Sequence, residues 1–250
     1  MKIQLIRNAT MKFFYGPLCF LTDPYLAPKH TLPTYAGRSA NPTADLPLPI
    51  AGILSGVQMT LLSHAHGDHF DKTAQEALPK DGLIYCQPSN EERIRQMGFT
   101  NVRAVEDEVE WQGIRITRTE GQHGSGEVLD DMGVVSGYVI SKAGGPVIYW
   151  VGDSILTDEV LRAVDRYKPD VILTHSCGAV WGKEKTLILM DAAQTIALCK
   201  YAPASNVVAI HMEAVDHATI TRSDLTRESG KAGISDARLG IPKDGETLEF

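Results

Sequence analysis

Three histidines and one aspartate lie within six residues of this sequence, directly after an apolar run that is typical of a β-strand. His64 and His66 are two residues apart, so an extended backbone points both rings to the same side. The glycine that follows lets the chain turn, which brings Asp68 and His69 back over the same point. Imidazole and carboxylate together form a ligand set that suits zinc, manganese or iron. The spacing therefore predicts a metal site, whereas the ordinary alternative is a polar loop of unrelated histidines.

Three more candidate ligands follow predicted strands further along the chain. His123 has glycines on both sides in TEGQHGSG, Asp153 ends the apolar run IYWVGDS, and His211 ends the run VVAIH. Each of these residues alone is a weak signal, because a single polar residue at the end of a strand is common. Because all three follow the histidine cluster and each lies at the end of a predicted strand, they are stronger ligand candidates together than singly.

The motif His-x-His-x-Asp-His at the end of a strand resembles the signature of the metallo-β-lactamase superfamily, and the resemblance covers nearly the whole chain. It implies an α/β fold, an αββα sandwich of two mixed β-sheets flanked by helices. It also implies two divalent metal ions, zinc in first place and manganese or iron as alternatives. Seven residues would hold them: His64, His66 and His123 at one ion, Asp68, His69 and His211 at the other, and Asp153 as a bridge.

A pair of metal ions explains why such a cluster would exist. Two ions roughly 3.5–4 Å apart lower the pKa of a bridging water and stabilise the charge that develops on the substrate. Asp68 and Asp153 reduce the net charge of the site, and their second oxygens can orient the water or relay a proton. We therefore expect a metal-dependent hydrolase in which Asp68 is catalytic.

The substrate is less constrained than the chemistry. The segments LTDPYL, SHAHGDHFD, QHGSG and VGDS resemble the smaller hydrolases related to ascorbate-6-phosphate lactonase, which implies a small ester, lactone or phosphorylated metabolite. No phosphate-recognition set can be matched residue by residue. Three alternatives stay open: a phosphodiesterase or nuclease, a thioesterase, and a non-catalytic metal-binding sensor on the same fold.

Composition narrows the partners and the location. The chain has 250 residues, 43% of them hydrophobic and 22% charged, with a net charge of −7. This acidic balance argues against a nucleic acid polymer or an anionic membrane as a partner. No apolar run approaches the length of a signal peptide or a transmembrane helix, so we expect a cytoplasmic protein. Its four scattered cysteines are expected to be free and mostly buried, and a homo-oligomer is left open.

Three further residues are candidates for substrate contact or for support of the metal ligands. Asp23 ends a strand before Pro24, where it either orients a metal-binding histidine or forms a local turn. His175 ends another strand and is expected on the same rim as Asp153. His217 follows His211 by six residues and could donate a hydrogen bond to substrate.

The elements that must position these residues can be read from the apolar pattern. Residues 2–23 read as a strand followed by a hairpin, and short strands alternate with helical stretches from residue 59 onward. Residues 24–58 contain six prolines, which excludes regular structure for most of that segment. We expect one domain over residues 1–250, with the proline-rich segment over or beside the metal site.

Overall fold

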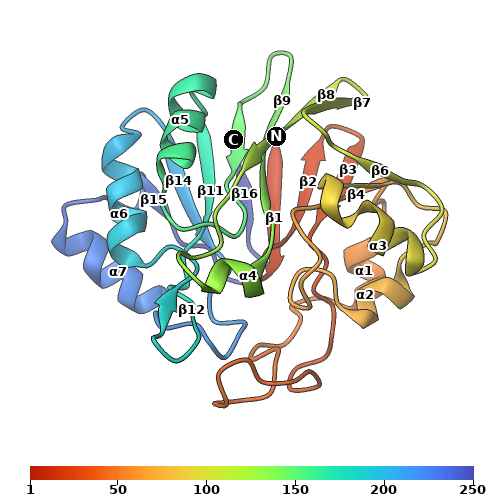
Figure 1. Ribbon diagram of the computed structural model, residues 1–250. Helices are drawn as coiled ribbons and strands as arrows, with labels where there is room; N and C mark the ends of the chain where they lie inside the picture. The colour runs from red at the N-terminus through yellow and green to blue at the C-terminus, as the bar shows by residue number, and fades with distance from the viewer.

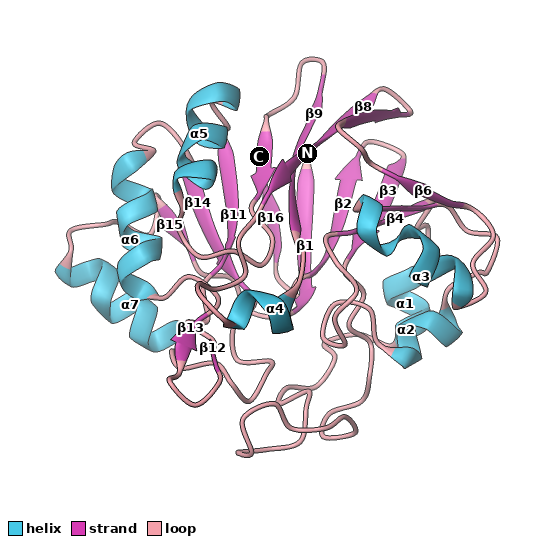
Figure 2. Cartoon of the chain, in the orientation of Figure 1, coloured by secondary structure: helices cyan, strands magenta, loops and turns pink.

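Two β-sheets pack face to face with helices on their outer sides, as Figure 1 and Figure 2 show. The computed structural model describes residues 1–250. The expected αββα sandwich of mixed sheets is therefore confirmed. None of the helices is long and apolar enough to cross a membrane.

The first sheet has seven strands and changes character at its middle. Four antiparallel strands come from the two ends of the chain, and three strands then continue in parallel from β3. Their order is β16 (Thr247–Glu249), β1 (Lys2–Arg7), β2 (Thr10–Tyr15), β3 (Leu18–Thr22), β4 (Met59–Leu62), β5 (Ile84–Cys86) and β6 (Val102–Ala104). The hairpin predicted for residues 2–23 is present as β1 to β3.

The second sheet also has seven strands, four of them parallel. Their order is β15 (Leu239–Gly240), β14 (Asn206–Ile210), β11 (Val171–His175), β10 (Ile148–Trp150), β9 (Ser136–Lys142), β8 (Ile114–Glu120) and β7 (Glu108–Trp111). A short hairpin, β12 (Val180–Trp181) and β13 (Thr186–Leu187), stands apart from both sheets.

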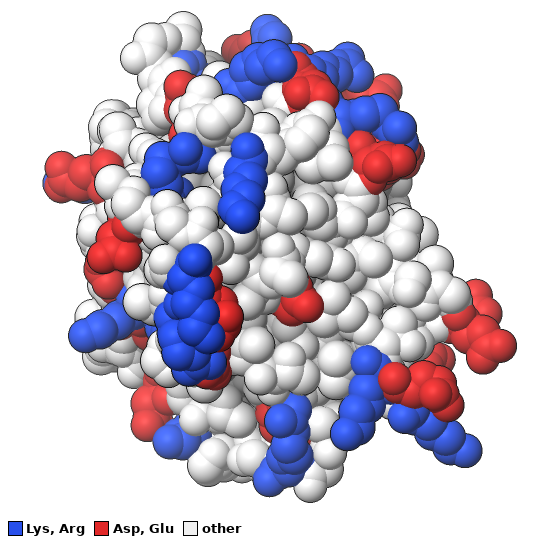
Figure 3. All heavy atoms as spheres, turned by 90° about the vertical axis from the view of Figure 1, so that its left-hand side faces the viewer, with Lys and Arg blue, Asp and Glu red and all other residues white.

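Seven α-helices cover the outer faces and the edge of the sandwich. They are α1 (Ile50–Leu54), α2 (Lys72–Ala77), α3 (Glu91–Gln96), α4 (Val128–Met132), α5 (Asp158–Tyr167), α6 (Ala192–Tyr201) and α7 (Arg222–Lys231). Figure 3, which looks onto the side of α5 to α7, shows acidic and basic side chains close together over that face. Ion pairs such as Arg162–Glu159 and Lys231–Glu228 account for this mixture.

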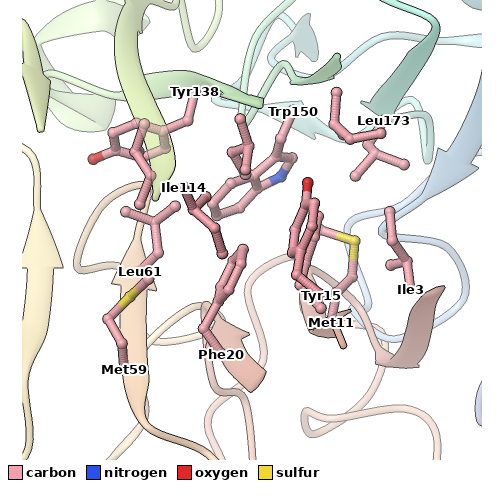
Figure 4. Close-up of a cluster of buried hydrophobic side chains, with 14 of the residues drawn as sticks. Ile3, Met11, Tyr15, Phe20, Met59, Leu61, Ile114, Tyr138, Trp150 and Leu173 are labelled. Atoms are coloured by element: carbon pink, nitrogen blue, oxygen red, sulfur yellow. The ribbon is translucent and has the colours of Figure 1, made fainter. Parts of the chain in front are cut away.

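Strand alternation divides the core into layers. On β10, Ile148 and Trp150 point between the sheets, where they join 19 other buried residues in the central cluster. Tyr149, between them in sequence, points the other way and packs in the cluster under α5, α6 and α7. Across the central layer the rings of Phe20 and Trp111 pack edge to face with their centroids 6.1 Å apart. Figure 4 shows Phe20 among the buried side chains. The period of two thus determines which side chains join the two sheets.

Some short elements were not predicted. The helix α4 has five residues and the strands β12 and β13 have two each. None of the three is long enough to show a hydrophobic repeat in the sequence. The proline-rich segment is irregular, as predicted, apart from α1 and one isolated bridge between Leu32 and Asn41. All four cysteines are free and buried, as predicted.

The proline-rich segment is joined to α2 by one buried carboxylate. Asp71 caps α2 by accepting a hydrogen bond from the Ala74 amide at 2.9 Å. Its other oxygen accepts hydrogen bonds from the amides of Leu26 and Ala27, which begin the irregular segment. Both the helix start and the entry to the segment depend on this side chain.

We expect Asp71→Ala to lower the free energy of unfolding by about 2–4 kcal/mol, because it leaves several buried amides without acceptors. Chemical denaturation of the metal-loaded protein measures this loss. Asp236→Ala, at an exposed position, is the control and should stay within about 0.5 kcal/mol of the parent protein. Equal stability of the two variants would contradict the role of Asp71.

Candidate metal centre

All seven predicted ligands come together at one edge of the sandwich, six of them in two adjoining groups of three. Ligand atoms of His64, His66 and His123 lie within 4.8 Å of one another. Those of Asp68, His69 and His211 form a second group within the same limit. The first sheet supplies the residues that follow β4, and the second sheet supplies those that follow β8 and β14.

The carboxylate of Asp153 lies between the two groups. Its Oδ2 atom is 3.2 Å from the Nε2 atom of His123 and 3.2 Å from that of His69. Its Oδ1 atom is 3.8 Å from Nε2 of His211. Asp153 follows β10, at the centre of the second sheet, so one short carboxylate reaches histidines from both sheets.

The other ring nitrogen of each of three histidines is held by a partner outside the centre. The Nδ1 contacts are His69 with Asp23 Oδ2 at 2.7 Å, His64 with Ser63 Oγ at 3.0 Å, and His123 with the Ile188 carbonyl at 2.9 Å. A ring that gives its Nδ1 proton to an acceptor such as Asp23 or the Ile188 carbonyl presents the lone pair of Nε2 inward. This orientation is typical of metal-binding histidines.

The arrangement of the ligand atoms that point into the centre favours a bound cation. The Nε2 atom of His64 is buried without a hydrogen-bond partner, although such atoms are normally paired. The Nε2 atoms of His69 and His211 are only 3.2 Å apart. When both nitrogens are unprotonated, as metal binding requires, two lone pairs at that separation repel unless a cation lies between or beside them. The donor set of imidazole nitrogens and carboxylate oxygens is one that zinc, manganese and iron accept.

Electrostatics keeps both carboxylates ionised. Burial alone would raise the pKa of the Asp153 carboxyl, but His69, His123 and His211, in their protonated forms, outweigh burial and hold that pKa well below its usual range. The pKa of Asp68 is lowered in the same way, against burial, chiefly by His69. Two buried negative charges beside inward-facing nitrogens make the centre a strong cation site.

Three residues beside this centre have a strained backbone. Asn8, Asp23 and His211 have positive φ angles of 58°, 34° and 62°, a region that residues with side chains rarely adopt. The His211 amide donates to the Asn8 carbonyl at 3.0 Å, and the Asn8 side chain contacts both His211 and the Asp68 carbonyl. These bends turn side chains at the ends of β1, β3 and β14 toward the centre.

Two of the three secondary candidates, Asp23 and His175, are buried behind the predicted ligands and do not line the pocket. Asp23 is fully buried and contacts His69, so it supports a ligand from behind. His175 is also fully buried and meets the Asp153 carboxylate, which excludes the substrate contact considered for it. The Trp150 indole donates to His175 Nε2 at 3.0 Å, so His175 carries its proton on Nδ1 and donates it to Asp153.

A pocket of about 200 Å³ opens directly onto the predicted ligands. His66, Asp68 and His217 form its polar wall, and the other lining residues are Tyr35, Gly67, Asp131, Met132, Trp181 and Ile188. The Tyr35 and His217 rings meet edge to face at 5.1 Å. The proline-rich segment therefore reaches the site through Tyr35. Tyr25, near the start of the same segment, is buried against Arg7 and does not line the pocket.

Two features of the site carried no signal in the sequence. Asp216 accepts hydrogen bonds from the amides of Tyr35, Ala36 and Arg38, and so holds the tip of the proline-rich segment beside the pocket. These partners are about 180 residues apart in sequence. The Sγ atom of Cys177 lies 3.6 Å from Nδ1 of His211, a contact between residues 34 apart in sequence.

Comparison with known proteins places this geometry in a family. Residues 19–212 match the model of the beta-lactamase superfamily domain. The UPF0173 protein YddR of Bacillus subtilis is 33% identical over the full length of both chains. The structure of an isothiocyanate hydrolase from Delia radicum gut bacteria is 36% identical, with a TM-score of 0.94, 100% of this chain covered and 99% of that one. A possible metal-dependent hydrolase from Veillonella parvula is 32% identical, with a TM-score of 0.95 over 99% of this chain and 98% of that one.

The contact between Asp23 and His69 predicts a measurable effect on metal affinity. Asp23→Asn removes the charge that orients the His69 ring, so we expect metal affinity to fall about 10–100-fold. Competition with a chromogenic chelator measures this change. Asp170→Asn is a matched control, since Asp170 is exposed and accepts a hydrogen bond from the Val147 amide. Unchanged affinity in Asp23→Asn would show that Asp23 does not support the metal ligand.

Proposed function

Because this chain belongs to the β-lactamase superfamily and is a metal-dependent hydrolase, we propose that it uses two divalent metal ions to direct water onto a small electrophilic substrate. The observation that carries this proposal is the position of Asp153 between two groups of inward-facing ligands. We assign His64, His66 and His123 to one ion, Asp68, His69 and His211 to the other, and Asp153 to both. Zinc is the ion we favour, with manganese or iron as alternatives.

The bound ions would lower the pKa of a water and polarise the substrate. The chain's own residues would do the rest. Asp68 borders the pocket and is the only predicted ligand carboxylate among its lining residues, so it is placed to orient the water and accept its proton. His175 holds the Asp153 carboxylate in place with a neutral ring, since burial lowers the pKa of His175 to about 4.

His217 is a pocket residue outside the predicted ligand set and is suited to contact the substrate. Burial lowers its pKa to about 4, so the ring is neutral at pH 7 and has one nitrogen available as a donor. It lines the pocket together with His66 and Asp68, and its ring meets those of Tyr35 and Trp181 edge to face. We propose that His217 donates a hydrogen bond to the leaving atom of the substrate.

For the substrate we propose an isothiocyanate as the first class to test. A protein described as an isothiocyanate hydrolase is 36% identical over the whole chain. The pocket supports this choice, because Met132, Ile188 and Trp181 give it an apolar side and no Lys or Arg lines it. The balanced reaction is R–N=C=S + H2O → R–NH2 + COS, in which water attacks the central carbon and the C–N bond then breaks. Small esters and lactones present a similar carbon and form the second class.

The metal assignment predicts a stoichiometry. We expect about two divalent ions per chain after loading, and fewer than one in Asp153→Ala, because a bridging carboxylate contributes to both positions. Elemental analysis after gel filtration gives the ratio. Asp131→Ala, a pocket carboxylate outside both ligand groups, is the control for metal content. A full complement of metal in Asp153→Ala would refute the bridge.

The catalytic assignment predicts a selective loss of rate. With metal at saturation, Asp68→Asn should lower kcat by roughly 10²–10⁴ while the protein stays folded. Loss of isothiocyanate absorbance and release of amine measure turnover, and Asp236→Asn is the exposed control. Normal kcat in Asp68→Asn would remove its catalytic role. No turnover of isothiocyanates, lactones or esters above the metal-free protein would sink the proposed function itself.

A further inference from the structure

The pocket beside the metal ligands is too small to enclose an extended substrate. Its volume is about 200 Å³, whereas sites for small molecules usually measure about 300–1,000 Å³. Tyr35 and Trp181 line this pocket and also line a second, larger groove of about 760 Å³. A substrate whose reactive carbon sits at the metals would therefore extend past these two rings into the groove.

The groove is basic, although the protein as a whole is acidic. Arg38, Lys183 and Lys185 line it, and no Asp or Glu does so. None of the three forms an ion pair within 4.0 Å, unlike Arg162, Arg222 and Arg227 on the neighbouring helices. The net charge of the chain is −7, but the local charge of this groove is positive, because its three cations have no carboxylate partners.

Two elements carry these cations. Arg38 stands on the tip of the proline-rich segment, where its amide donates to Asp216 at 3.1 Å and its Nη2 atom donates to the Ala218 carbonyl at 3.0 Å. Lys183 and Lys185 stand on the turn of the β12–β13 hairpin. The Trp181 indole donates to Asp131 at 3.0 Å, which fixes this hairpin beside the inner pocket.

We propose that this groove binds an anionic group, a carboxylate or a phosphate monoester, at the end of the substrate remote from the reacting carbon. The inference rests on the proposed function, because it assumes that the reacting carbon lies at the metal centre. Asp131 lines the inner pocket and Arg38, Lys183 and Lys185 line the outer groove. This difference in charge orients the substrate with its anionic end outward.

A matched set of substrates tests the proposal on the metal-loaded protein. The set is 4-isothiocyanatobenzoate, its neutral methyl ester, and 4-isothiocyanatophenyl phosphate. We expect kcat/KM to be about 10-fold higher for at least one anion than for the neutral ester, mainly through KM. The preferred anion distinguishes a carboxylate site from a phosphate site. The preference should weaken between about 50 and 500 mM NaCl, because salt screens exposed charges.

In the variant Lys183→Gln/Lys185→Gln, the ratio of kcat/KM for the preferred anion to kcat/KM for the neutral ester should fall at least about 5-fold. The control Lys200→Gln/Lys243→Gln makes the same change of charge at exposed positions outside the groove. Equal kcat/KM for anions and ester in the parent protein, or a preference that survives in the lysine variant, would overturn the inference. In both results the ester is still hydrolysed, so the proposed function stands.

A binding measurement covers the case in which no isothiocyanate is hydrolysed. Trp181 is half-buried in the groove, whereas Trp111 and Trp150 are buried in the core, so quenching of tryptophan fluorescence reports on the groove. We expect 4-nitrobenzoate to bind more tightly than neutral nitrobenzene, and to lose that advantage in Lys183→Gln/Lys185→Gln. Equal binding of the two probes would overturn the anion site independently of any activity.

Discussion

The repulsion among inward-facing groups at the metal centre is the constraint on which this structure depends. Two imidazole nitrogens lie 3.2 Å apart, a third is buried without a partner, and two carboxylates stay ionised among them. Such an arrangement is costly in a buried site unless cations occupy it. The centre also joins the two sheets, because Asp153 from one sheet reaches His69 from the other. Metal binding should therefore contribute to holding the sandwich together.

The support behind the ligands follows from the same constraint. A histidine presents its Nε2 lone pair reliably only if its Nδ1 atom has a fixed partner. Asp23 provides this for His69, and His175 orients Asp153 in turn, with its own tautomer set by Trp150. Trp150 belongs to the central core, so the packing between the sheets is connected to Asp153 through two hydrogen bonds in series, Trp150 to His175 and His175 to Asp153. The strained backbone at Asp23 and His211 is tolerated because Asp23 is held by Ser63 and His69, and the His211 amide donates to the Asn8 carbonyl.

Recognition is assigned to different parts of the chain from catalysis. The strands fix the ligands rigidly, whereas the pocket is closed by a proline-rich segment and a short hairpin that belong to neither sheet. Asp216 connects the two parts, since it lies five residues after His211 and holds the amides around Tyr35. A change in the segment or the hairpin can alter the substrate without disturbing the metals. The inner pocket, lined by Asp68 and Asp131, and the basic outer groove share Tyr35 and Trp181 and form one path of this kind.

The sequence by itself determined the fold class and brought all seven candidate ligands into view. Strand alternation and the spacing of His64, His66, Asp68 and His69 are local properties, and the polar residues at strand ends could be read one by one. What only the tertiary structure decided are the contacts between distant segments. His175 looked like a residue of the rim but is buried behind Asp153, and Asp216 gave no signal because its partners lie about 180 residues away. The basic groove is likewise formed only by folding, because Arg38 and Lys183 come from separate segments of the chain.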